Sequence, residues 1–123
     1  MYTIDMDPAR TLIRVQLGGM MSVEEVDLYV ADLSRAFIHH KMRAGYIMLI
    51  DVSAGVIQSQ DVVAALIGHI AAFPKARRIA MVIGSSLARM QVRRVMTQDY
   101  TRTFDNASEA ETWLLYADQA AAA

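Results

Sequence analysis

Hydrophobic and polar positions alternate at the start of the chain. Residues 2–6 and 11–17 repeat with a period of two, which is typical of strands buried on one face. The segment between them, 7–10, contains Pro8 and polar residues that favour a turn. Because this connection is short, we expect the two strands to form an antiparallel hairpin.

Helical spacing and continuous apolar runs alternate through the rest of the chain. Residues 46–52 and 77–83 are apolar runs typical of strands buried on both faces, and 101–104 is expected as a short edge strand. A serine or asparagine that can cap a helix precedes each segment with helical spacing. These helices are expected from Ser22 through Phe37, at 59–73, at 85–97, and from Asn106 or Ser108 onward.

The resulting order is β-β-α-β-α-β-α-β-α. It predicts a single α/β domain with a five-stranded, mixed but mostly parallel sheet covered by four helices. We expect the domain to span residues 1–119, followed by a frayed alanine tail at 120–123. The 123 residues are enough to bury one hydrophobic core.

Composition narrows the functional classes. The chain is 54% hydrophobic and 20% charged, which excludes disorder as its main state. A net charge of -1 gives no general reason to bind nucleic acid, so no nucleic-acid partner is expected. The absence of cysteine excludes disulfides and thiolate metal sites.

No segment has the pattern of a signal peptide or a membrane span. The most apolar run, residues 62–73, is shorter than a span requires and contains His69. We therefore expect it to be a buried helix of a cytoplasmic protein.

Three segments carry recognisable motifs. Residues 46–52 are an apolar run with an acidic residue, Asp51, at its end. Residues 77–84 are basic and then apolar, and in 104–114 Glu-Ala and Trp-Leu follow an aromatic and an acid. In this order the segments resemble the central strand, the next strand and the closing signature of the STAS and SpoIIAA-like family. The best-known members are bacterial anti-sigma-factor antagonists. The resemblance implies a SpoIIAA-like fold and a non-enzymatic regulatory or protein-interaction module whose partner is another protein or a second copy.

The same resemblance singles out Ser59. Antagonist members carry a phosphorylatable serine at the start of the helix after the central strand, usually preceded by aspartate. Ser59 occupies the matching place but follows Gln58. The resemblance therefore implies a possible phosphoacceptor, while the residue type alone indicates a helix N-cap. Both interpretations are compatible, because a phosphate is stabilised at a helix N-terminus.

Several small and polar residues follow the two central strands. In open α/β sheets, ligands bind at the carboxyl ends of the strands. A ligand or anion site is possible there, formed by Asp51, Ser53, Gly84, Ser85 and Ser86. The alternative is that these residues only close loops and cap a helix, because the chain has neither a phosphate-loop motif nor a nucleophile elbow.

The third predicted helix carries a cluster of basic residues. Arg89 and Arg93 share one face, and Arg94 follows them. They form a possible surface for an anionic partner, although a solvated helix face is the simpler interpretation.

A second function class arises from the wider superfamily, which is similar to the CRAL-TRIO lipid-carrying domains. That similarity implies a carrier or sensor of a small apolar ligand or lipid. Nine methionines occur in the chain, and some could line an adaptable pocket or simply fill the core. The candidates are Met20, Met21, Met81, Met90 and Met96.

Catalysis is not expected. The three histidines lack the spacing of metal ligands, and no acid–base pair or activated nucleophile can be recognised. We therefore expect no metal site, no cofactor and no enzymatic activity.

Self-association is expected as a homodimer. Leu28 and Ile38 fall on the polar side of the first predicted helix. Ala64, Gly68 and Ala72 recur every four residues on the second, which allows close packing on a second copy or on the sheet.

Overall fold

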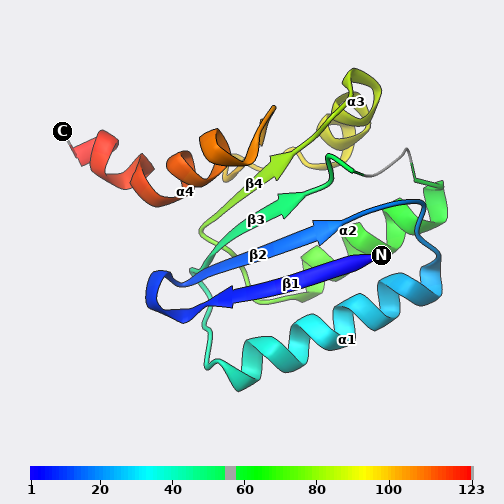
Figure 1. Ribbon diagram of the computed structural model, residues 1–123, viewed down its shortest axis with the longest axis horizontal. Coiled ribbons are helices and arrows are strands. Elements are labelled where there is room, and N and C mark those ends of the chain that lie inside the picture. The colour runs from blue at the N-terminus through cyan, green and yellow to red at the C-terminus, as the bar shows by residue number, and fades with distance from the viewer. Residues whose placement is uncertain (55–57, 123) are drawn as a thin grey trace.

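The computed structural model describes residues 1–54 and 58–122. Its elements follow the predicted order and confirm the fold class (Figure 1). They are β1 (Tyr2–Asp7), the 3-10 turn η1 (Pro8–Arg10), β2 (Leu12–Leu17), α1 (Val23–His39), β3 (Ile47–Asp51), α2 (Gln60–Ala72), β4 (Arg78–Val82), α3 (Ser86–Val95), β5 (Thr101–Phe104) and α4 (Ala107–Ala122).

The strands lie side by side in sequence order, β1-β2-β3-β4-β5. β1 pairs antiparallel with β2, as the hairpin prediction required, and every later pair is parallel. Each crossover therefore moves one strand in the same direction. Since such crossovers are right-handed, α1, α2 and α3 all pack on one face of the sheet, and α4 covers the other (Figure 1).

The central strand β3 is buried on both faces, as its apolar run predicted. Met48 and Ile50 face the three-helix side, where they join the larger core cluster. Ile47 and Leu49 point to the opposite face and pack with α4 through Ala110 and other residues. This alternation is the period-two geometry of a strand between two layers.

Helix α1 matches its predicted face. The Ser22 hydroxyl accepts a hydrogen bond from the Glu25 N–H at 3.1 Å and caps the helix. Tyr29 and Leu33 are among its buried residues, and Leu28 and Ile38 are 60% and 76% exposed. The predicted outer side of α1 is therefore confirmed.

Helix α2 departs from the prediction of a buried helix. Among its described side chains, Val62 alone is buried. The small residues Ala64, Gly68 and Ala72 are exposed, so the suggestion that they press on the sheet is wrong. The physical reason is that α2 packs against α1, where His69 meets Tyr29, and a cavity separates much of the helix from the sheet.

The remaining boundaries are close to those expected. α3 ends at Val95, two residues earlier than predicted. α4 continues to Ala122, and Ala123 lies outside the described residues, so the fraying of residues 120–123 and the 1–119 boundary stay predictions. Within the described ranges, every helix is too short or too polar to cross a membrane.

Candidate functional site

The residues predicted at the carboxyl ends of β3 and β4 do lie together. Asp51 ends β3, and its carboxylate accepts hydrogen bonds from the Ser53 N–H at 2.9 Å and the Ser53 hydroxyl at 2.5 Å. A Cβ atom on Gly84 would lie only 2.9 Å from the Ser53 carbonyl oxygen, so the loops after β3 and β4 are in direct contact.

These contacts favour closure of the loops over binding of an anion. The Asp51 carboxylate already holds its own loop, and its negative charge disfavours an anion beside Ser53. Ser85, rather than Ser86, caps α3, because its hydroxyl accepts from the Ala88 N–H at 3.1 Å. A ligand at this edge therefore stays a prediction.

Ser59 caps α2, as its residue type predicted. Its hydroxyl accepts a hydrogen bond from the Val62 N–H at 3.3 Å, and its side chain is exposed. The hydroxyl stands at the helix N-terminus, which stabilises negative charge. The geometry is compatible with a phosphate there and does not require one.

Gln58 is a residue whose role sequence reasoning missed. Its amide oxygen accepts from the Met21 N–H at 2.8 Å, and its amide nitrogen donates to the Gly19 carbonyl at 2.9 Å. The Gln91 amide donates to the Gln58 backbone carbonyl at 3.3 Å. Gln58 therefore joins the loop before α1 and helix α3 to the start of α2. The signal in the sequence was a glutamine where the antagonist pattern has an aspartate.

The outer face of α3 differs from the predicted basic surface. Arg89 forms an ion pair with Asp105 and is largely covered, so it is not available as predicted. Arg93 and Arg94 are exposed. Leu87 and Met90, which the sequence analysis did not place in this surface, are 65% and 53% exposed. Their spacing puts all four on one side of the helix. We call Leu87, Met90, Arg93 and Arg94 the α3 surface.

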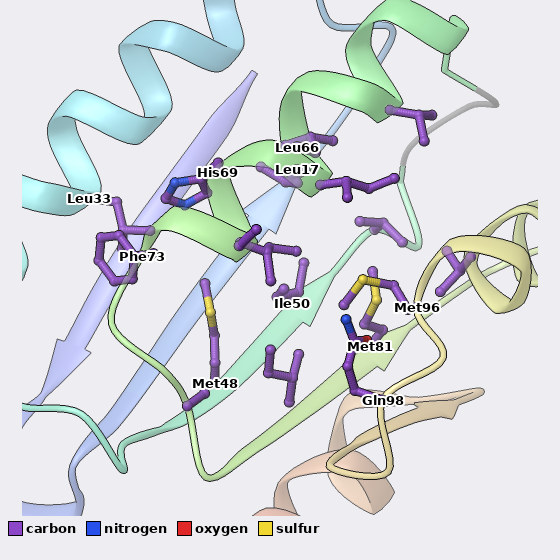
Figure 2. A pocket seen from close by; sticks show the side chains of 18 of the residues that line it. Leu17, Leu33, Met48, Ile50, Leu66, His69, Phe73, Met81, Met96 and Gln98 are labelled. Atoms are coloured by element: carbon purple, nitrogen blue, oxygen red, sulfur yellow. The ribbon is translucent and has the colours of Figure 1, made fainter.

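An apolar cavity of about 320 Å³ lies between α2, α3 and the sheet. Figure 2 shows Met48 and Ile50 of β3 and Met81 of β4 on its floor, with Leu66 and His69 of α2 above them. We call this space the α2–α3 cavity. Its walls are predominantly aliphatic and aromatic.

Methionines line the cavity, in part as expected. Met21, Met81 and Met96 contribute to its walls, together with Met48, which the sequence analysis did not select. Met20 and Met90 are exposed, so the expectation that they also line a pocket is wrong. Met90 lies on the outer side of α3, and Met20 lies in the loop before α1. Sequence spacing alone does not show which way these two side chains point.

His69 and Tyr46, two titratable residues of the cavity lining, are each held by contacts with neighbouring groups. The His69 ring packs against Tyr29 and Phe73, with ring centres 5.7 and 5.0 Å away, and burial lowers its pKa. The Tyr46 hydroxyl donates to the Pro74 carbonyl at 2.8 Å, and burial raises its pKa to about 12. No carboxylate is found among the described residues that line this space.

The chain is similar to known proteins in its structure. No family model and no curated protein matches the chain. A protein of the DUF3478 family with a SpoIIAA-like fold from Shewanella loihica PV-4 superposes with a TM-score of 0.68 at 15% identity, covering 92% of this chain and 93% of that one. An anti-sigma factor antagonist from Mycobacterium paratuberculosis superposes with a TM-score of 0.60 at 9% sequence identity, covering 93% of this chain and 94% of that one.

A third solved structure aligns with this chain over the full length of both. The anti-sigma factor antagonist SpoIIAA in its unphosphorylated form has a TM-score of 0.61 and 14% identity over 100% of each chain. This chain has the SpoIIAA-like fold. The resemblance drawn from residues 46–52, 77–84 and 104–114 is thus confirmed at the level of the fold.

Within the SpoIIAA-like fold, Ser59 and Gln58 mark the start of the helix after the central strand. An aspartate in place of Gln58 could accept the Met21 hydrogen bond but could not donate to Gly19. The departure from the antagonist pattern therefore has a structural consequence at this position.

Proposed function

We propose that this chain is a non-enzymatic regulatory module that binds a protein partner through the α3 surface. The observation that carries the proposal is the exposure of Leu87 and Met90 beside Arg93 and Arg94. Methionine and arginine are enriched in protein interfaces, and exposed apolar side chains rimmed by charge are typical of such sites. The two arginines favour a partner with acidic residues around its contact region.

The structural neighbours support the same class. Two of the three reported above are named as anti-sigma factor antagonists, and that name describes opposition to another protein. We also propose a bacterial, cytoplasmic setting; the two neighbours with named organisms support its bacterial part.

Affinity capture from a lysate of the source organism tests the proposal. The tagged chain, the Leu87→Glu, Met90→Glu variant and the matched Leu28→Glu, Ile38→Glu variant are compared. Because buried anchor residues carry much of an interface's binding energy, we expect recovery of the partner to fall about tenfold or more with the α3 variant only. Equal recovery with all three proteins, or no specific recovery, would contradict the proposal.

A second candidate function is carriage or sensing of a small apolar ligand. The specific observation in its favour is the α2–α3 cavity, whose volume of about 320 Å³ lies in the range of ligand pockets. The two functions are compatible, because the cavity lies behind α3 and the α3 surface faces outward.

A further inference from the structure

We infer that the α2–α3 cavity binds a straight-chain carboxylic acid, with its chain along β3 and its carboxylate beside Lys75 and Gln98. This inference rests on the second candidate function and names its ligand class. Three observations carry it: the extent and lining of the cavity, the polar groups at one end, and the direction of the Gln98 side chain.

The shape of the cavity fits an extended chain. Both Met48 and Val52 line it, so it follows β3 for about 13 Å at roughly 3.3 Å per residue. Its volume of about 320 Å³ corresponds to roughly ten groups the size of a water molecule or a methylene. A saturated chain of about ten carbons would occupy this space.

The chemistry of the walls fits an aliphatic chain better than a rigid ring. Met48, Met81 and Met96 are unbranched and can adjust to a flexible neighbour. Burying each methylene of such a chain contributes about 0.8 kcal/mol of transfer free energy.

One end of the cavity has a cation and an amide donor. The Lys75 amine lies 5.2 Å from the centre of the Tyr100 ring, which holds it near this end by a cation–π interaction. Gln98 stays close to Tyr100, because the Thr101 N–H donates to its carbonyl at 3.1 Å. Lys75, Gln98 and Tyr100 all line the cavity.

The Gln98 amide points inward. Figure 2 shows it directed into the cavity beside Met81 and Met96. Gln98 is an exposed residue, and no hydrogen bond from its side chain to another described residue is found. Asp99 is not part of the lining, whereas Lys75, which is also exposed, contributes a positive charge to it. A carboxylate accepts hydrogen bonds from both groups and neutralises the amine.

Methionine methyl NMR tests the inference directly. Decanoic acid and 1-decanol are titrated separately into the ¹³C-methyl-methionine-labelled protein, below their aggregation concentrations. We expect decanoate to shift the Met48, Met81 and Met96 signals and to leave those of the exposed Met20 and Met90 unchanged. We expect 1-decanol to shift the same three signals with about tenfold lower affinity, because it lacks the charge-assisted bond to Lys75.

Two substitution pairs locate the ligand. Lys75→Gln should weaken decanoate binding about tenfold and leave 1-decanol unaffected, and Lys41→Gln, at the other lysine of the chain, should change neither. Ala88→Phe, in the cavity wall, should abolish binding of both probes, while Ala64→Phe, on the exposed side of α2, should not.

The outcomes separate the two claims. Equal affinity for decanoate and 1-decanol, unchanged by Lys75→Gln, overturns the carboxylic acid inference and leaves an apolar-ligand function standing. No shift of the cavity methionines with either probe overturns both.

Discussion

Gln58 shows how one side chain can hold several segments in place. Its amide oxygen accepts a hydrogen bond from the Met21 N–H, and its amide nitrogen donates one to the Gly19 carbonyl. This combination needs both an acceptor and a donor on one side chain. Gln58→Glu keeps the acceptor and places a negative charge against the Gly19 carbonyl. We expect a loss of about 1 kcal/mol in the free energy of unfolding, measured by urea denaturation. Unchanged stability would mean that the amide contributes nothing net.

Gly84 is required by a close approach. A Cβ atom there would meet the Ser53 backbone oxygen at 2.9 Å, so the backbone must move. We expect Gly84→Ala to destabilise the protein by about 1–3 kcal/mol. Gly68→Ala is the matched control, because a Cβ at this exposed position on α2 meets nothing within 4 Å. It should stabilise by about 0.5–1 kcal/mol. Equal effects of the two substitutions would contradict the account.

Substitutions at Ser59 distinguish a helix N-cap from a phosphorylation switch. Loss of the hydrogen bond to the Val62 N–H in Ser59→Ala should lower the free energy of unfolding by about 1 kcal/mol. Ser59→Asp should be tolerated, because aspartate also caps helices. If capping is the whole role, partner capture stays unchanged in both variants. Loss of capture in a folded Ser59→Asp protein would instead support a phosphorylation switch.

At the scale of elements, the sequence was informative where burial follows a simple period. The 3.6-residue spacing in α1 and the continuous run of β3 were enough to predict which side chains are buried. Helix α2 was not predictable in this way, because it is apolar on most sides and carries little directional pattern. Its distance from the sheet, and therefore the cavity, depends on tertiary packing against α1.

The position of His69 on α2 predicts a pH dependence of stability. Its ring meets Tyr29 and Phe73, and burial lowers its pKa below the ordinary 6.5. Since the unfolded chain then binds the proton more readily, stability should fall as the pH drops from about 7.5 to about 5.5. His69→Gln should show a smaller fall in its urea midpoint than the unsubstituted protein. His39→Gln, at an exposed site, serves as the control. Identical pH profiles for His69→Gln and the unsubstituted protein would refute this prediction.

At the scale of the whole molecule, a homodimer stays a prediction. Leu28 and Ile38 form an exposed apolar pair on α1. We expect light scattering at micromolar concentration to give about twice the 13.7 kDa of one chain. Leu28→Glu with Ile38→Glu should restore the monomer mass without unfolding. A monomer mass for the unsubstituted protein would end the hypothesis, and a dimeric double variant would place the interface elsewhere.

The candidate sites were only partly predictable for a related reason. Asp51, Ser53 and Gly84 could be brought together from the sequence, because parallel strands end at one edge. The pairing of Arg89 with Asp105, and the exposure of Leu87 and Met90, depend on how α3 is rotated against the sheet. Spacing along one helix does not determine that rotation.

Hydrogen–deuterium exchange on the complex with the captured partner tests the central claim most directly. We predict slower exchange on binding in α3 (Ser86–Val95), with little change in α4. Protection confined to α4, or to the exposed side of α1 around Leu28 and Ile38, would contradict a partner site on the α3 surface.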